Sequence, residues 1–172
     1  TYSIMKLQHK SLVFFFSLLI STFSFAQKKV TSPAETVTGK INGATITIKY
    51  GSPSVKGRAI WGALVPYDKV WRAGANDATT FETDKTITIE GKQLPAGKYS
   101  FFVIPNENES IIIFNKEAKQ WGSYDYKASS DQLRVTVKNE NGDALVEKLE
   151  YKIMETRIEL LWEKLIISFE VK

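Results

Sequence analysis

Apolar and polar residues alternate with a period of two along most of the chain after residue 35. This alternation is typical of β-strands that bury one face. Prolines, glycines and asparagines, which favour turns, separate the alternating segments. The pattern predicts strands at Thr36–Ile41, Ala44–Tyr50, Thr79–Thr83, Lys85–Glu90, Lys98–Ile104, Ser110–Asn115, Gln132–Lys138, Leu145–Ile153, Thr156–Glu163 and Leu165–Val171.

Three details of the pattern indicate how the strands are arranged. Asn42-Gly43 separates the first two strands, and both residues tolerate the positive φ of a two-residue hairpin turn. Tyr99–Ile104 and Ile111–Phe114 are apolar on both faces, so we expect them to be central strands. Short strands at short spacing predict an all-β fold, either a two-sheet antiparallel β-sandwich (jelly-roll or immunoglobulin-like) or a partly closed barrel.

The alternation stops between Gly51 and Thr79, which predicts a long irregular loop that caps one end of the fold. Loops of this length are uncommon in compact domains and are often functional or packed by their own side chains. In a purely structural interpretation the loop's tryptophans are buried, because burying one tryptophan stabilises a fold by about 5 kcal/mol. The expected apolar cap is Ile60, Trp61, Leu64, Val65, Val70 and Trp71.

In a functional interpretation the same loop forms a concave binding surface. An aromatic ring beside amide, guanidinium and carboxylate groups suits a carbohydrate, and paired arginines suit a small acidic ligand. Later in the chain, Trp121-Gly122 with Tyr124 and Tyr126 could complete the surface, although a buried corner is favoured there. The candidate ligand-binding residues are Arg58, Trp61, Tyr67, Trp71, Arg72, Asn76, Asp77 and Thr79.

The first 26 residues have the layout of a secretory signal peptide preceded by a few upstream residues. Met5 starts a short basic region, the apolar run Ser11–Phe25 follows, and a small-x-small site ends at Ala26. The apolar run is shorter than the about 20 residues that cross a bilayer. We therefore expect cleavage near Ala26, a periplasmic or extracellular protein without a membrane span, a flexible lead-in at 27–35 and one domain at 36–172.

Composition narrows the chemistry of the exported part. His9 is the only histidine and the chain has no cysteine, so thiolate nucleophiles, imidazole bases, structural zinc and haem ligation are excluded after cleavage. We expect no cofactor and no metal. Without Lys6 and Lys10, 21 basic residues face 19 acidic ones, a net charge of +2 without clustering. Nucleic acid is therefore not an expected partner, and we expect a monomer or weak association.

Several short segments carry a resemblance to a known family. They are Pro53-Ser-Val-Lys-Gly-Arg58, Gly62-x-Leu-Val-Pro66, Val70-Trp-Arg-x-Gly-Ala-Asn76 with Ala78-Thr79, Leu94-Pro-Ala-Gly-x-Tyr99, Ile112-Ile-Phe-Asn-Lys116 and Trp121-Gly122. In them the chain resembles domain of unknown function 2911, a family of exported bacterial proteins. The resemblance implies an exported β-rich domain, and it assigns no activity, ligand or catalytic residue.

The sequence leaves three kinds of function open. It favours a non-catalytic binding or envelope-associated module for a carbohydrate or a small acidic ligand. A carboxylate-based hydrolase is the first alternative, with Asp77 and Glu82 the carboxyl pair nearest the loop. A purely structural envelope protein is the second. Asn139–Asp143 lacks the ligand spacing of a calcium loop and predicts a hairpin turn instead.

Overall fold

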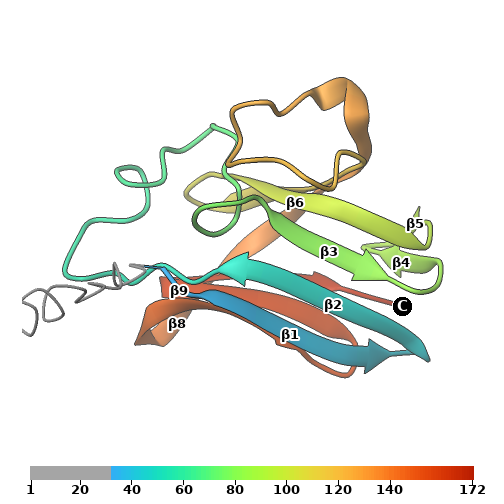
Figure 1. The fold of residues 1–172 in the computed structure, drawn as a ribbon. Coiled ribbons are helices and arrows are strands. Elements are labelled where there is room, and N and C mark those ends of the chain that lie inside the picture. Colours follow the sequence, from blue (N-terminus) through green and yellow to red (C-terminus); the bar gives the residue numbers. More distant parts are fainter. Residues whose placement is uncertain (1–31) are drawn as a thin grey trace, which may run out of the picture. The chain divides into compact units, whose positions relative to one another are not determined.

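The computed structural model of the chain describes residues 32–172 (Figure 1). The predicted signal peptide, its cleavage site and the lead-in up to residue 31 lie outside the described residues. Residues 32–172 are all-β, as predicted, and none of their helical turns is long and apolar enough to span a bilayer. The elements are β1 (Ala34–Ile41), β2 (Ala44–Gly51), β3 (Thr79–Thr83), β4 (Ile87–Ile89), β5 (Lys92–Leu94), β6 (Gly97–Pro105), β7 (Glu109–Asn115), the 3-10 helix η1 (Ala128–Ser130), β8 (Asp131–Ile153) and β9 (Arg157–Glu170).

Seven strands form one antiparallel sheet in the order β1-β2-β3-β6-β7-β8-β9. The strands β4 and β5 form a separate hairpin, inserted in the chain between β3 and β6. All other neighbours in the sheet are consecutive in the chain. Because antiparallel neighbours can be joined by short turns, most of the sheet is built from local pairings.

The first hairpin has the turn that the sequence predicts. Asn42 and Gly43 both have positive φ, 49° and 78°, the geometry that matches the twist of paired strands. Ile46 and Ile48 of β2 are buried on one face, as expected from the alternation. β1 begins at Ala34, two residues earlier than predicted, and pairs with β2 along its whole length.

β8 changes partner along its length. It pairs with β7 as far as Lys138 and with β9 from Asn139 onward, with register shifts between Asn141 and Glu150. The hairpin turn predicted at Asn139–Asp143 is therefore wrong. That segment belongs to β8 because β9 supplies partners for its backbone where the pairing with β7 ends.

The chain reverses direction inside β9. The N–H of Val171, just past the end of this 14-residue strand, donates to the carbonyl of Thr156, just before its start, at 2.8 Å. A strand of this length would span about 46 Å if it were straight. The reversal falls at Glu163, which has a φ of 58°. The two strands predicted for this region are thus the two arms of β9.

The sheet curls until its far end meets its beginning. Pro53–Val55, which continues from β2, pairs with Glu147–Leu149 of β8 through backbone hydrogen bonds of 2.8 and 2.9 Å. Gly39 of β1 packs on Ile153 of β8, where a Cβ on the glycine would lie 2.7 Å from Ile153 Cγ2. The large sheet is therefore nearly barrel-shaped. The two-sheet sandwich is not confirmed, and the partly closed barrel describes the sheet better.

The core lies inside this curled sheet, and a smaller apolar cluster lies outside it. Phe81, Phe101 and Phe114 pack edge to face or tilted in the core, with ring centroids 5.0 to 6.5 Å apart. Phe102 of β6 and Ile113 of β7 point the other way and form the outer cluster with parts of two loops. Both central strands are thus covered on both faces, as predicted.

Two loops make up the outer layer over β6 and β7. They are the β2–β3 loop (residues 52–78, green in Figure 1) and the β7–β8 loop (residues 116–130, orange). Ala78 and Val70 from the first and Tyr126 from the second belong to the outer cluster. The long irregular segment expected between Gly51 and Thr79 is present with those bounds.

The β4–β5 hairpin is not predicted by the sequence, which indicates one strand over Lys85–Glu90. The structure ends β4 at Ile89 and turns the chain at Glu90 and Gly91, with φ of 46° and 81°. β4 then pairs with the end of the chain, where Thr88 and Lys172 exchange backbone hydrogen bonds of 2.6 and 2.9 Å. A glutamate at the first turn position conceals this hairpin, because Asn or Asp is the usual residue there.

Candidate ligand-binding site

The β2–β3 loop is anchored at Ala73, a fully buried residue with a φ of 53°. Its carbonyl oxygen accepts hydrogen bonds from Thr79 Oγ1 at 3.0 Å and from Tyr151 Oη at 2.7 Å. Non-glycine residues with positive φ persist where their surroundings over-determine them. Gly51 of β2 lies so close that a Cβ there would collide with the carbonyl of Ala75. The chain from Ala73 to Asn76 is therefore held tightly against β2.

The two tryptophans of this loop are core residues. Trp61 and Trp71 pack with Trp162 of β9, with ring centroids 5.6 to 6.0 Å apart. Trp71 and Trp162 are buried and Trp61 is half-buried, so these rings mainly stabilise the fold. Leu64, predicted to join the cap, is instead exposed because it lies on the outer side of the turn that Val65 N closes onto the Ile60 carbonyl.

Arg58 and Tyr67 stabilise turns of the loop. Arg58 donates from Nε to the Val55 carbonyl at 3.1 Å and from Nη2 to the Ser54 carbonyl at 2.6 Å. The ring of Tyr67 packs against Gly62, where a Cβ would lie 2.9 Å from Cε2. Neither side chain contributes to the hollow described next.

Asn76 and Asp77 are exposed and lie at a hollow of about 360 Å³ between the loop and the strands β1, β2 and β6. We call it the Asn76 hollow. Asn76 has a φ of 65° and donates from Nδ2 to the Ser32 carbonyl at 3.2 Å. The volume lies near the lower end of the range for ligand pockets. Other polar residues of its walls are Glu35, Thr36, Lys49, Tyr50, Thr80 and Lys98.

Trp121 of the β7–β8 loop is 60% exposed. It does not line the hollow itself, but it pairs with Asp77, which does. Its backbone pairs with that of Asp77 in an antiparallel bridge, next to a hydrogen bond of 3.0 Å from Ala78 N to the Gln120 carbonyl. Residues paired directly across such a bridge project to the same face, with Cβ atoms about 5 Å apart. The side chains of Trp121 and Asp77 therefore leave the bridge on the same face.

The buried corner favoured for Trp121-Gly122 is wrong for the tryptophan. Phe102 and Tyr126, with ring centroids 5.1 Å apart, already fill the space over the sheet, so the indole remains outside. Tyr124 is also exposed, at 81%. A Cβ on Gly122 would lie 3.1 Å from the Tyr124 ring and 3.7 Å from Nη1 of Arg72. Arg72 and two exposed aromatic rings thus gather around Gly122.

The position of the exposed tryptophan depends on Asn115 at the end of β7. The fully buried amide donates from Nδ2 to the Lys127 carbonyl at 3.0 Å and to Asp131 Oδ1 at 2.8 Å. Its Oδ1 accepts from Glu117 N at 3.0 Å and from Gln120 Nε2 at 3.2 Å. All four hydrogen-bonding positions of the amide are used. The loop is therefore anchored at its base.

The Asn76 hollow offers a mixture of donors and acceptors. Burial, with the charges of Glu35 and Glu150, raises the pKa of Tyr50, so its hydroxyl is protonated at neutral pH and can donate. Lys49 and Lys98 supply ammonium groups, and Lys98 Nζ lies 4.0 Å from a Glu82 oxygen. Such a mixture can hydrogen-bond the hydroxyls of a polyhydroxy ligand.

The structure divides the sequence-predicted residues into two sets. Asn76 and Asp77 lie at the hollow, and Arg72 lies near Trp121, whereas the other candidates hold the loop together: Arg58, Trp61, Tyr67, Trp71 and Thr79. The hollow's strand residues, among them Lys49 and Tyr50 of β2 and Lys98 of β6, were missed because nothing in the linear pattern shows that these strands border one hollow. Within residues 32–172 no group of three or more Asp and Glu side chains could hold a metal ion.

The chain was compared with known families, curated proteins and solved structures. A family described as protein of unknown function (DUF2911) matches residues 32–171. The chain belongs to the DUF2911 family. The DUF2911 match extends over every described strand and over both loops that meet at Trp121, in agreement with the resemblance of the short segments. The comparison with curated proteins and the comparison with solved structures gave no match.

Proposed function

We propose that this chain is an exported, monomeric, non-catalytic module that binds a carbohydrate at the Asn76 hollow. The exposed indole of Trp121 beside Asp77 carries the proposal. A large aromatic ring in solvent presents a flat apolar face, and the adjacent carboxylate can fix the hydroxyls of a sugar stacked on it. Export is supported by the signal-like layout of residues 1–26.

Preorganisation of the two loops supports binding at this place. Asn115 and Ala73 hold the parent loops of Trp121 and Asp77 through buried hydrogen bonds. A ligand therefore pays little entropy to order these groups. An exposed aromatic residue without a binding role would not require buried hydrogen bonds to hold its loop in place.

Lys49 and Lys98 favour a second candidate, a small acidic ligand. Both residues line the hollow, and the ammonium group of each can form a charge-assisted hydrogen bond to a carboxylate. A carboxylate-based hydrolase has less support, because Glu82 does not border the hollow and lies near Lys98 instead. A sugar that also bears a carboxylate would satisfy both sets of groups.

A glycan screen with a matched variant tests the proposal. Thermal shifts of the full chain would be measured against neutral oligosaccharides, uronic-acid oligosaccharides and simple dicarboxylates, followed by calorimetric titration of each hit. We expect an oligosaccharide to bind, and we expect Trp121→Ala to weaken it by about ten-fold or more, since buried aromatic contacts dominate recognition.

The controls separate lost binding from lost folding. Trp121→Ala should melt within about 2 °C of the wild type, because substitutions at exposed positions change stability little. Leu64→Ala removes an exposed apolar side chain elsewhere and should leave the affinity unchanged. A panel without hits would favour a structural role. If Trp121→Ala left the affinity unchanged, the ligand would bind somewhere other than the proposed site. If dicarboxylates bound and oligosaccharides did not, the second candidate, a small acidic ligand, would be favoured.

A further inference from the structure

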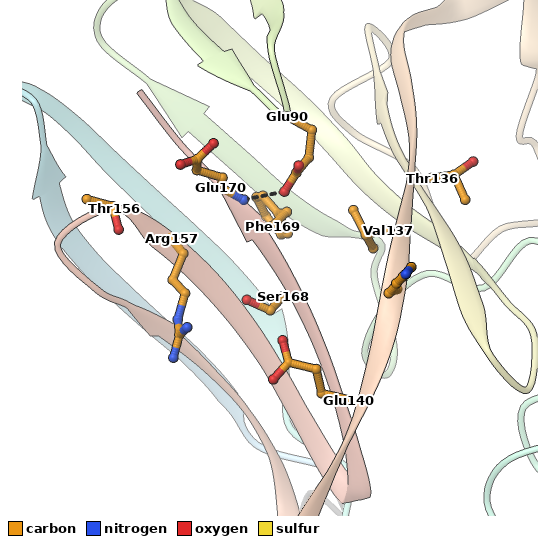
Figure 2. Close-up of a pocket in the computed structure, with 10 residues that line it drawn as sticks. Glu90, Thr136, Val137, Glu140, Thr156, Arg157, Ser168, Phe169 and Glu170 are labelled. Carbon is orange, nitrogen blue, oxygen red and sulfur yellow. Dashed lines mark hydrogen bonds between the residues drawn. The ribbon is translucent and has the colours of Figure 1, made fainter.

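A second hollow, of about 530 Å³, opens where β8 and β9 part (Figure 2). The ladder between the two strands ends at the pair Asn139 and Ile167. Beyond it the end of β9 turns toward the β4–β5 hairpin, and Glu90 N donates to the Glu170 carbonyl at 3.2 Å. We call the gap the β8–β9 hollow. It shares no wall residue with the Asn76 hollow.

Several polar groups around the β8–β9 hollow already have partners within the fold. Arg157 Nη2 lies 2.8 Å from Glu159 Oε1. Glu90 Oε1 accepts a hydrogen bond from the backbone N–H of Glu170 at 2.6 Å, drawn as a dashed line in Figure 2. These contacts hold this part of the rim in place.

Lys138 and Glu140 differ from the other rim residues. Both are exposed, both face the hollow from β8, and neither forms an ion pair with another residue between 32 and 172. Residues two apart in a strand point to the same side, about 6.7 Å from each other. One cationic and one anionic side chain therefore leave β8 about two residue repeats apart, beside the buried side chains of Val137 and Phe169.

We propose that the β8–β9 hollow binds a dipeptide-sized zwitterion, with its carboxylate on Lys138 and its ammonium on Glu140. The two ends of an extended dipeptide are about two residue repeats apart, roughly 6.7 Å, which is close to the separation of Lys138 and Glu140 along the backbone of β8. The ends of a single amino acid are too close together to reach both. In Figure 2, Ser168 and Glu140 point toward the same part of the hollow, so the serine hydroxyl can meet the peptide backbone.

The proposal is tested by titrating the full chain with L-Ala-L-Ala and following backbone amide shifts by NMR. Two blocked probes each remove one charge: N-acetyl-Ala-Ala lacks the ammonium, and Ala-Ala-amide lacks the carboxylate. Exposed charge pairs are individually weak, so we expect each blocked probe to bind about three- to five-fold more weakly than Ala-Ala. Free alanine should bind more weakly as well.

Variants assign each end of the probe to one side chain. The Lys138→Gln variant should bind Ala-Ala more weakly than the wild type does, and it should bind Ala-Ala and Ala-Ala-amide with equal affinity. The Glu140→Gln variant should bind Ala-Ala and N-acetyl-Ala-Ala with equal affinity. Lys40→Gln, on the exposed face of β1, is the matched control and should bind normally. Trp121→Ala should also bind Ala-Ala normally, so failure of the sugar site and failure of this one are distinguishable. Equal binding of free and blocked peptides, or no binding of Ala-Ala, would overturn the proposal.

Discussion

Tyr151 shows at the scale of one residue how the core holds the candidate site. Its hydroxyl donates to the carbonyl of Ala73, the anchor of the β2–β3 loop, at 2.7 Å. Burial raises its pKa well above the ordinary value of 10.0, against a smaller lowering by a hydrogen bond with Thr79. The reason is that a tyrosinate inside the core would lose its hydration. Ionisation of Tyr151 at high pH would therefore remove the hydrogen bond that it donates to the loop at Ala73.

We expect the free energy of unfolding to fall as the pH rises above about 10, because Tyr151 ionises in the unfolded chain and resists ionisation in the folded one. The substitution Tyr151→Phe removes the contribution of this residue to the loss of stability at high pH. The variant should lose about 1 kcal/mol at pH 7 through the missing hydrogen bond, and its stability should fall less steeply above pH 10. Urea unfolding at several pH values measures both effects.

Other tyrosines also contribute to the loss of stability at high pH. The pKa values of Tyr50, Tyr99 and Tyr126 are also raised, first of all by burial, so some alkaline loss persists in the variant. Tyr124→Phe, at an exposed position, should behave as the wild type at every pH. An unchanged alkaline slope in Tyr151→Phe would contradict the assignment.

At the scale of an element, the β7–β8 loop is organised from its two ends. Its base is Asn115, at a register irregularity of the β7–β8 ladder. Near the far end Tyr126 Oη donates to Asp131 Oδ2 at 2.7 Å, and Arg134 Nε donates to the same oxygen at 2.6 Å. The exposed Trp121 lies between these contacts. Hydrogen bonds at its base thus hold this loop, which has few apolar residues.

Asn115→Asp should destabilise the fold by about 2–4 kcal/mol, because the carboxylate cannot donate and would face the carboxylate of Asp131 inside the protein. Urea unfolding measures the change. Asn141→Asp, at an exposed position of β8, is the matched control and should lie within about 0.5 kcal/mol of the wild type. A similar small effect at both positions would show that the buried amide does not hold the loop.

At the scale of the whole described fold, the end of the chain joins the curled sheet to the β4–β5 hairpin. Phe169 and Val171 are fully buried, and Lys172 exchanges backbone hydrogen bonds with Thr88 of β4. The second arm of β9 thereby connects the main sheet to the β4–β5 hairpin. The same divergence that brings this arm to β4 opens the β8–β9 hollow.

Removal of residues 168–172 should prevent stable folding. Loss of one buried phenylalanine side chain alone costs about 3–5 kcal/mol, a large part of the 5–15 kcal/mol that stabilises a typical domain. Circular dichroism and thermal melts of the truncated chain measure the effect. Deletion of Lys172 alone removes the terminal pair of hydrogen bonds and an exposed ion pair with Glu170, and it should leave a cooperative transition. A folded chain without residues 168–172 would show that the sheet closes without its last arm.

Some features of this protein follow from the local sequence pattern, and others depend on the tertiary structure. Alternation at Ile46 and Ile48, the Asn42-Gly43 turn and the two-sided apolar strands β6 and β7 follow from side-chain direction and backbone preference, so the sequence alone determined them. The pattern also located the irregular β2–β3 loop with the residues Asn76 and Asp77 in it.

Closure of the sheet and assembly of the sites were decided only by the tertiary structure. Trp121 meets Asp77, and Lys138 faces the gap beside β9, through contacts between segments far apart in the chain. Trp71 and Trp121 are the same residue type in similar loops, yet one is buried and the other exposed. A linear pattern records which way a side chain points from its own backbone. Whether a neighbour already fills the space it points into depends on the whole fold.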